Sequence, residues 1–298
     1  PLAGVGDNRS LPFPGVVSGY NGRRTDDEGK NAMAMVKVAT INILFDLEEW
    51  PERRELLVTG LAAVQADLIA LQEVKLPEDT SAWLATQLGM PYVYLVPRAT
   101  PTGQLLQDGI AILSRHPFVR QEMLALQGQE RVAQYVQVMV QGTPFVFCNG
   151  HYYWYPGSHP QRDTQVQQVI DWLEPLAAEC PIVAVGDFNG TPETSAIAQM
   201  QQHLTSAYAA YHGKEPAYTC PTPLARRSWR KLLRHLGRNL LVNHSLKPWR
   251  GTLDYIFVNH HLRVENCQLI LNQPAPGSRT LYPSDHFGIM AELEICLQ

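Results

Sequence analysis

The sequence predicts an α/β domain in which helices cover β-sheet, and three observations lead to this prediction. From Val36 onward, β-branched and aromatic runs typical of strands alternate with segments of helical spacing. The pattern continues over about 260 residues without an internal repeat. With 298 residues, of which 45% are hydrophobic, the chain can bury a sizeable core. We therefore expect one layered α/β sandwich domain.

The expected strands are short apolar runs bounded by turn residues, and the expected helices show the 3.6-residue period. Strands are predicted at residues 36–44, 68–71, 92–96, 109–114, 132–140, 145–149, 182–185, 253–258 and 288–293. Helices are predicted at residues 50–65, 81–88, 161–176 and 194–202. Pro51 suits the first turn of the first helix.

Residues 1–34 differ from the rest in showing neither period. They are rich in Gly, Pro, Asp, Asn and Arg, which is typical of a flexible segment. We expect a flexible leader or an artificial extension here, followed by the folded domain over residues 35–298.

Charge is distributed unevenly along the chain. The total is 24 basic and 28 acidic residues, a net charge of -4, but residues 225–250 contain eight basic residues and no acidic one. The remainder has 24 - 8 = 16 basic and 28 acidic residues, or -12. Six apolar residues in this basic segment follow helical spacing: Trp229, Leu232, Leu233, Leu236, Leu240 and Leu241. The pattern predicts a basic amphipathic helix inserted at about 225–250.

Three readings of this basic segment stay open. It is either a solvated surface helix, a surface that attracts the phosphates of RNA or DNA, or a contact with an anionic membrane surface. A local patch on an acidic body favours a phosphate-bearing partner over general nucleic-acid binding.

Cysteine usage and hydropathy exclude several classes of protein. The five cysteines are far apart and never form a C-x-x-C pair, which argues against a zinc knuckle or a disulfide scaffold. No apolar run approaches the roughly 18 to 20 residues of a membrane helix, and residues 1–34 lack the apolar centre of a secretory signal. We expect a cytoplasmic monomer without a transmembrane segment.

Polar residues follow or interrupt six apolar runs, at strand ends where sheet proteins often hold reactive groups. They are Thr40-Ile41-Asn42, Gln72-Glu73, Asn149-Gly150-His151, Gly186-Asp187-Phe188-Asn189, Leu253-Asp254-Tyr255 and Ser284-Asp285-His286. One such residue alone is more often a turn or cap residue than a catalytic group. Together they form a coherent set of carboxylates, amides and imidazoles. Such oxygen donors suit Mg²⁺ or Mn²⁺ better than Zn²⁺, and the set fits metal-assisted attack of water on phosphorus.

In this order the motifs resemble the endonuclease/exonuclease/phosphatase superfamily, over about residues 36–295. The resemblance rests on Asn42, Leu71-Gln72-Glu73-Val74, Gly186-Asp187-Phe188-Asn189, Leu253-Asp254-Tyr255 and Ser284-Asp285-His286. Softer motifs are similar to those of the nocturnin-like deadenylases: Trp50-Pro51 with Arg53-Arg54, His151-Tyr152-Tyr153-Trp154, Ser206-Ala207-Tyr208 and Glu215-Pro216-Ala217-Tyr218-Thr219. The resemblance implies a four-layer α/β sandwich of two mainly antiparallel β-sheets flanked by helices. It places a catalytic site at one edge of both sheets.

The resemblance also implies a metal site and a set of reacting groups. Glu73 would be the principal ligand of Mg²⁺ (or Mn²⁺), with Asn42 beside it and Asp285 as a further metal or supporting group. The catalytic residues would be Asp187, Asn189, His286, His151 and Asp254. Asp187 would activate the attacking water and Asn189 would hold it. His286, oriented by Asp254, would stabilise charge on the phosphoryl oxygens, and His151 would contact a nonbridging oxygen.

Substrate contacts are expected beside these groups. Asn149 would support the site, and Arg162 would orient a phosphate from the start of the following helix. Tyr153 and Trp154 would stack on a base or head group, although aromatic residues at such positions also fill core and surface sites.

The expected activity is Mg²⁺-dependent hydrolysis of phosphodiesters, with a 3′ exonuclease of deadenylase type acting on single-stranded nucleic acid as the leading reading. The first alternative is a phosphatase or phosphodiesterase for a small nucleotide, an inositol phosphate or a sphingomyelin-like lipid head group. The second is a silent binding module of the same fold, which the presence of both Glu73 and Asp187 disfavours. Members similar to apurinic endonucleases carry an acidic residue where this chain has Leu44, which argues against abasic-site repair and a second metal position.

Overall fold

The computed structural model describes residues 34–296 apart from 228–232, 234–236 and 238–248. The expected leader at 1–34 therefore lies outside the described residues except for Ala34. The predicted basic helix at 225–250 also lies outside them except at its two ends and at Leu233 and Gly237. Both expectations, and the domain boundary between 34 and 35, stay predictions.

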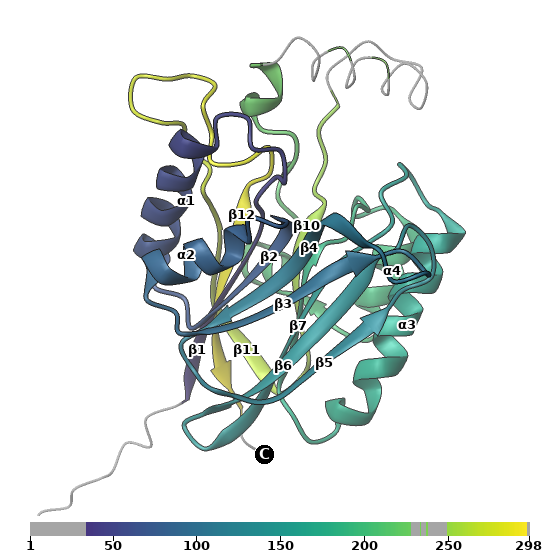
Figure 1. Ribbon diagram of the computed structural model, residues 1–298. Coiled ribbons are helices and arrows are strands. Elements are labelled where there is room, and N and C mark those ends of the chain that lie inside the picture. Colours follow the sequence, from purple (N-terminus) through teal and green to yellow (C-terminus); the bar gives the residue numbers. More distant parts are fainter. Residues whose placement is uncertain (1–33, 228–232, 234–236, 238–248, 297–298) are drawn as a thin grey trace, which may run out of the picture. The chain divides into compact units, whose positions relative to one another are not determined.

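Two six-stranded sheets form the centre of the described domain (Figure 1). The first sheet has the order β11 (Leu262–Ile270), β12 (Gly288–Ile295), β1 (Met35–Asn42), β2 (Leu68–Lys75), β4 (Leu105–Ser114) and β3 (Tyr92–Ala99). The second has the order β5 (Phe118–Ala125), β6 (Val132–Val140), β7 (Thr143–His151), β8 (Ile182–Asp187), β10 (Asp254–Val258) and β9 (Thr205–Ser206). The predicted four-layer α/β sandwich, two sheets flanked by helices, is confirmed.

Each sheet contains one parallel pair at its centre, and the other strand pairs are antiparallel. In the first sheet β1 runs parallel to β2, with Asn42 opposite Gln72. In the second sheet β7 runs parallel to β8, with His151 opposite Asp187. Because parallel strands end at the same edge of a sheet, each pair delivers two adjacent carboxyl ends to one place.

Helices cover the outer face of each sheet. α1 (Trp50–Val64) and α2 (Thr80–Leu88) pack on the first sheet, and α3 (Pro160–Ala177) and α4 (Ser195–Gln201) pack on the second. α5 (Ala207–His212) lies beside β10 and β11, and a 3₁₀ turn, η1, spans Pro223–Arg226. None of the helices in the described ranges is both long enough and apolar enough to cross a lipid bilayer.

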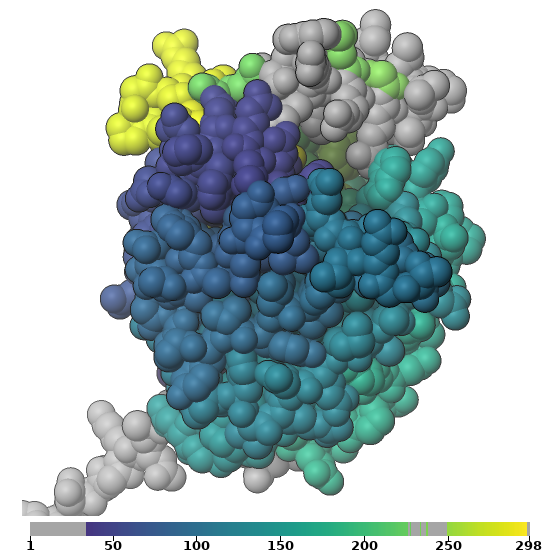
Figure 2. All heavy atoms as spheres, viewed as in Figure 1, coloured from purple at the N-terminus to yellow at the C-terminus, as the bar shows by residue number. Residues whose placement is uncertain are grey.

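The core has three main parts. Side chains such as Val38, Phe147 and Ile256 fill the space between the sheets, and two outer clusters join the sheets to their helices. Leu57 on α1 and Val169 on α3, both fully buried, are typical of those outer clusters. Figure 2 draws all atoms. On the side it shows, the first sheet with its helices and the second sheet with its helices form one continuous surface.

The predicted strands and helices that fall on described residues all exist, with ends shifted by a few residues, but the sequence prediction missed β5, β9, β11, α5 and η1. The two longer missed strands lack the alternation that marks a half-buried strand. β5 is an edge strand whose residues are mostly exposed, and β11 contains a bulge between Val264 and Asn266. A bulge shifts the period of two by one residue, so the pattern is lost where it occurs.

Candidate active site

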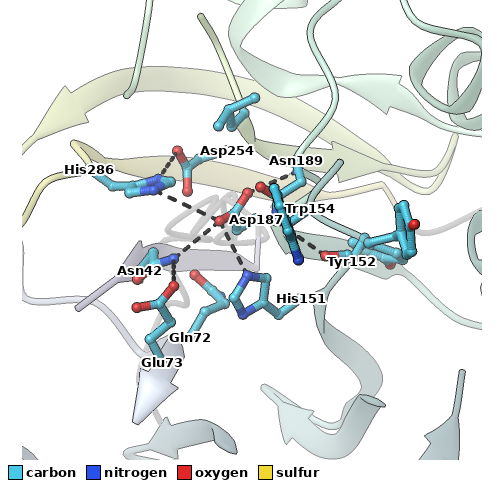
Figure 3. Close-up of polar contacts among 12 residues, drawn as sticks. Asn42, Gln72, Glu73, His151, Tyr152, Trp154, Asp187, Asn189, Asp254 and His286 are labelled. Atoms are coloured by element: carbon cyan, nitrogen blue, oxygen red, sulfur yellow. Dashed lines mark hydrogen bonds and ion pairs between the residues drawn. The ribbon is translucent and has the colours of Figure 1, made fainter. Parts of the chain in front are cut away.

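Polar side chains from both sheets meet at the edge where the two parallel pairs end (Figure 3). The first sheet supplies Asn42, Gln72 and Glu73 from β1 and β2. The second supplies His151, Asp187 and Asp254 from β7, β8 and β10, and the segment before β12 supplies His286. Residues that are far apart in the sequence thus come together, as the motifs predict.

A buried amide pair joins the two sheets behind this edge. The Gln72 amide donates to the Asn149 side-chain oxygen at 2.7 Å, and Asn149 donates to the carbonyls of Leu71 and Ala111, each at 3.1 Å. Both side chains are fully buried, so leaving either one unpaired would cost roughly 1–3 kcal/mol. Asn149, a predicted substrate contact, is therefore engaged inside the sandwich, where it fixes one sheet against the other.

Gly186 allows β7 and β8 to approach closely just before their ends at His151 and Asp187. Gly186 has φ 136°, and a Cβ atom there would lie 1.9 Å from the carbonyl oxygen of Gly150. Only glycine fits this contact without moving a strand. Because the contact precedes His151 and Asp187 in register, it places these two side chains next to each other.

Asp187 is the centre of the polar cluster. One carboxylate oxygen accepts a hydrogen bond from the Asn42 amide at 3.1 Å and lies 3.5 Å from His151 Nε2 and 3.9 Å from His286 Nε2. The other oxygen accepts from the Asn189 backbone N–H at 2.9 Å. Burial raises the pKa of Asp187 to about 6, against the opposing effect of the His286 charge. A carboxylate with a pKa near neutrality is suited to accept a proton.

His286 forms a buried pair with Asp254. Its Nδ1 lies 2.9 Å from the Asp254 carboxylate, which is fully buried. Burial alone would lower the pKa of His286, but Asp254, Cys220 and Asp187 outweigh this effect and raise it well above its usual range. The imidazole is therefore held as a cation, with Nε2 facing Asp187.

His151 differs from His286 in charge. Burial and the positive charges of Arg131, Arg98 and His286 lower the pKa of His151 well below its usual range, so the ring is neutral. Its Nδ1 is buried without a hydrogen-bond partner in the part of the chain that the structure describes. A neutral ring with a free nitrogen can accept or donate a hydrogen bond, depending on its tautomer.

Glu73 lies on a bulge in β2. The register against β4 shifts between Gln72 and Val74, and Glu73 has φ 58°. The bulge turns its carboxylate toward Asn42, whose amide donates at 3.2 Å, and toward the Phe45 backbone N–H at 3.1 Å. Burial and the nearby negative charge of Asp285 raise the pKa of Glu73 to about 7. Two repelling carboxylates with oxygen donors fit a hard divalent cation, which would relieve the repulsion.

Asn42 holds both carboxylates with its amide nitrogen. The same Nδ2 donates to Glu73 and to Asp187, while Oδ1 accepts from the Leu44 backbone N–H at 3.1 Å. This arrangement favours Asn42 as a group that positions the two carboxylates. Its predicted role as a direct metal ligand requires the oxygen to face the site and stays a prediction.

A pocket of about 380 Å³ opens beside these groups. Its wall contains Glu73 and His151, together with Phe45, Arg98, Asp108, Gln129, Glu130, Arg131 and Trp154. Trp154 is 42% exposed, and Figure 3 shows it near the Asp187 cluster. Trp154 therefore lines the pocket, and its stacking on a substrate stays a prediction.

Arg162 is a predicted phosphate contact that the structure places elsewhere. Its side chain is fully buried at the start of α3, and its guanidinium donates to the carbonyls of Tyr153 at 2.9 Å and Asn189 at 2.6 Å. Two further bonds reach the carbonyls of Tyr155 and Gly157. The two terminal nitrogens of this guanidinium donate to four carbonyls and so hold the loop of residues 153–157, which leaves only the buried Nε–H without an acceptor in the described part of the chain. Arg162 therefore connects the start of α3 to this loop and to the end of β8.

Tyr153 also turns away from its predicted role. Its ring stacks on His159 with the centroids 4.5 Å apart. Asn189 donates its side-chain amide to the Tyr152 carbonyl at 3.2 Å and thus ties the end of β8 to the same loop. These contacts order the loop that carries Trp154.

Sequence reasoning assigned no structural or binding role to two buried arginines. Arg53 on α1 donates to the carbonyls of Ile43 at 3.0 Å and Pro283 at 3.3 Å, which joins the loop after β1 to the segment before His286. Arg131 precedes β6 and faces the pocket. Neither residue lies on a strand-end motif, and a basic residue in a turn or on a helix is usually read as surface charge.

The chain is similar to known proteins in sequence and in structure. Residues 39–286 match the model of the Endonuclease/Exonuclease/phosphatase family. Human nocturnin is 26% identical over 270 residues, 82% of this chain and 58% of the relative. Bovine 2′,5′-phosphodiesterase 12 is 26% identical over 341 residues, 92% of this chain and 53% of the relative. The chain thus spans little more than half the length of these curated relatives.

Solved structures show the same fold. The human nocturnin catalytic domain with bound sulfate superposes with a TM-score of 0.67 at 24% identity, covering 88% of this chain and 94% of that one. TDP2 from D. rerio, complexed with single strand DNA product, superposes with a TM-score of 0.70 at 16% identity, covering 88% and 99%. At these identities the likeness concerns the fold.

Proposed function

The chain belongs to the endonuclease/exonuclease/phosphatase family, and from this premise we propose that it is a metal-dependent phosphodiester hydrolase. Within that class we propose a 3′ exonuclease of deadenylase type that acts on single-stranded nucleic acid. The observation that carries the proposal is the buried Asp187 carboxylate, which lies between Asn42, His151 and His286, and of these groups His151 also lines the pocket.

Asp187 accepts the proton of the attacking water. Asn42 and the Asn189 backbone N–H fix the orientation of its carboxylate, so little reorganisation is needed when the proton arrives. Its pKa of about 6 leaves most of the carboxylate ionised at neutral pH while keeping it basic enough to act.

His286 and His151 bind the phosphoryl oxygens. His286 is cationic and is held by Asp254, so its Nε2 side presents positive charge where negative charge develops in the transition state. Neutral His151 contributes a hydrogen bond from the opposite sheet. The Nε2 atoms of both rings face the same carboxylate oxygen of Asp187, at 3.5 and 3.9 Å, so a phosphate bound at that carboxylate would lie within reach of both rings.

Glu73 and Asp285 would hold Mg²⁺ or Mn²⁺ at the half-exposed edge of the first sheet, with Asn42 alongside. The bound ion supplies Lewis-acid polarisation of a phosphoryl oxygen. Carboxylate and amide oxygens are the donors that such an ion prefers.

Nucleic acid is the proposed substrate for two reasons. A similar sequence is named for 2′,5′-phosphodiester hydrolysis, and a similar structure contains a single-stranded DNA product. In this chain, exposed Trp154 and half-exposed Phe45 offer rings at the pocket, and stacking on such rings tolerates any base.

A small phosphorylated nucleotide is the second candidate substrate. The pocket of about 380 Å³ lies at the lower end of the size range of small-ligand sites, which is about 300–1,000 Å³, and would enclose a nucleotide-sized group. Phosphatase activity on such a compound uses the same groups. Cytoplasmic location and a monomeric state stay predictions.

A time course with 5′-labelled single-stranded oligoadenylate tests the proposal. We expect a ladder that shortens from the 3′ end in Mg²⁺, and no shortening with chelator or in Glu73→Ala. Intact RNA alongside hydrolysis of a phosphorylated nucleotide would favour the second candidate. Equal turnover in Glu73→Ala would overturn the assignment of this site, and binding of RNA without any turnover would indicate a silent binding module.

A further inference from the structure

Arg131 is a buried cation at the pocket, next to the proposed catalytic groups. Its side chain is 6% exposed and lines the pocket together with Glu73 and His151. Its backbone closes a turn: the N–H donates to the Gly128 carbonyl at 3.4 Å, and the carbonyl accepts from the Leu126 N–H at 2.9 Å. The turn therefore fixes Arg131 just before β6 begins at Val132.

The guanidinium of Arg131 has no partner among the residues that the structure describes. It takes part in no ion pair or side-chain hydrogen bond there, and its Nε is buried without an acceptor. Arg53 and Arg162, the other two deeply buried arginines near the site, donate to backbone carbonyls through most of their N–H groups. An arginine side chain has five N–H donors, and buried donors in proteins nearly always have acceptors. A buried arginine side chain without acceptors therefore indicates a site for a ligand.

The neighbouring charges do not neutralise Arg131. Asp108 faces the same pocket, but it is already paired with Arg98. Nη1 of Arg98 donates to both carboxylate oxygens of Asp108, at 2.8 and 2.9 Å. Arg98 also donates to the carbonyls of Gln129 and Glu130 and so adds its own charge to this side of the pocket. The carboxylate of Glu130 belongs to an exposed residue at the rim.

Electrostatics show how close Arg131 is to the reacting groups. Burial and the Arg98 charge lower its pKa to about 10, whereas Glu73 and Asp187 act in the opposite direction. Arg131 is therefore charged at neutral pH, and it interacts with both proposed catalytic carboxylates. Burial of most of the side chain weakens the hydration of this charge, and an anion in the pocket would pair with it.

We propose that Arg131 binds a second phosphate of the substrate, adjacent to the phosphate that is hydrolysed. The inference rests on the proposed function and narrows it to substrates with two phosphates in reach of one pocket. Guanidinium recognises phosphate through a planar pair of N–H donors, which suits a fixed, buried side chain. Phe45 and Trp154 line the same pocket and would flank the nucleoside between the two phosphates.

Two sources of the second phosphate have the same chemistry. It is either the next phosphodiester of a polynucleotide or the terminal phosphate of a small nucleotide. Three substrates separate these cases: the dinucleotide ApA, which has one phosphodiester, and the same dinucleotide with a phosphate added at its 5′ or 3′ end. Longer oligoadenylate with a free 5′-hydroxyl provides only internal phosphates.

The experiment compares wild type with Arg131→Met on these substrates in Mg²⁺. We expect the added phosphate, at one of the two ends, to lower KM in the wild type by about tenfold to hundredfold, the range for hydrogen bonds to a charged group. In Arg131→Met we expect the ratio of KM values for ApA with and without the added phosphate to fall to about one, whatever change the lost charge causes in the turnover of plain ApA. Dependence on length but not on the terminal phosphate would identify the next phosphodiester as the ligand.

Matched variants separate recognition from folding. Arg120→Met removes an exposed arginine from β5. It should leave unchanged the gain in KM from the added phosphate, at either end of the dinucleotide. Arg131→Lys keeps the charge without the planar fork and should retain only part of the gain. Melting temperatures of all variants in chelator report on folding independently of activity.

A binding measurement distinguishes failure of this inference from failure of the proposed function. In the Asp187→Asn background, equilibrium dialysis of the phosphorylated dinucleotides should show the same tenfold to hundredfold dependence on Arg131 without turnover. Equal affinity for ApA and its phosphorylated forms, with Arg131 present, would overturn the inference even if hydrolysis is normal. Lack of hydrolysis by the wild type, with the binding contrast intact, would overturn the proposed function and leave the phosphate site standing.

Discussion

The two sheets bring different kinds of residue to the same edge. The second sheet contributes Asp187, Asp254 and His151, which are at least 97% buried and fixed by close strand contacts. The first sheet contributes Glu73 on a bulge and Leu44 beyond Asn42, both at positive φ and only partly buried. The difference fits their proposed tasks, because proton transfer needs fixed orientation and exclusion of water, whereas a cation needs an open path.

The largest expected effect comes from the buried edge. Asp187→Asn keeps the shape of the side chain but removes the base, so kcat should fall by about 10³- to 10⁴-fold. Asp171→Asn on the exposed face of α3 is the matched control. A loss smaller than tenfold, measured by steady-state hydrolysis of oligoadenylate, would mean that another group activates the water.

The open edge should respond through metal affinity. Glu73→Gln removes a carboxylate charge and should raise the Mg²⁺ concentration for half-maximal activity by about 10²-fold or more, since even supporting residues of metal sites are worth about 10–100-fold. Glu52→Gln, on the exposed side of α1, serves as the control. An unchanged Mg²⁺ dependence with lowered kcat would place Glu73 among the reacting groups instead.

A smaller loss is expected one step behind the reacting groups. Asp254→Asn leaves a hydrogen-bond partner for His286 but removes the charge that holds the ring as a cation. We expect kcat to fall by about 10- to 100-fold with KM nearly unchanged, because the charge acts mainly in the transition state. A rise in KM alone, at constant kcat, would argue that His286 merely binds substrate.

The smallest expected effect concerns stability without metal. With its folded-state pKa raised to about 7 from an ordinary 4.5, Glu73 favours folding only while protonated, so stability declines as pH rises from about 4.5 to 7. In chelator, the wild type should lose roughly 1–2 kcal/mol more over this range than Glu73→Gln, after allowing for partial exposure. Urea unfolding at pH 4.5 and 7.5 measures this, and parallel pH dependence of the two proteins would refute it.

The strand-end residues and the fold class could be predicted from the sequence. The motifs pointed to Glu73 and Asp187, which follow apolar runs, and to Asp254 and His286, which stand just before apolar runs. The fold class followed from the same runs, and the two-sheet arrangement from family resemblance. Missed strands such as β5 lie at a sheet edge, where exposure removes the alternating pattern.

Residues that act through a partner could not be predicted in this way. Asn149 and Arg162 were expected to contact substrate, but their polar groups meet buried backbone carbonyls that come from distant segments. Arg131 gave no signal, because its significance lies in the partners it lacks. Whether a polar group is satisfied depends on the tertiary structure, and neither spacing nor composition encodes it.

The central claim is that Glu73 on the first sheet binds the metal, whereas Asp187 on the second sheet activates the water. Mg²⁺ binding to the metal-free protein tests this claim most directly. Asp187, Asp254 and His286 also lie close enough together to hold an ion, with one ligand atom of each within 4.8 Å of the others. Isothermal titration calorimetry of wild type, Glu73→Gln and Asp187→Asn separates the two locations. Our account predicts that Glu73→Gln abolishes the binding heat and that Asp187→Asn leaves it largely intact. The reverse result, with binding lost in Asp187→Asn and kept in Glu73→Gln, would contradict it and place the ion in the buried edge.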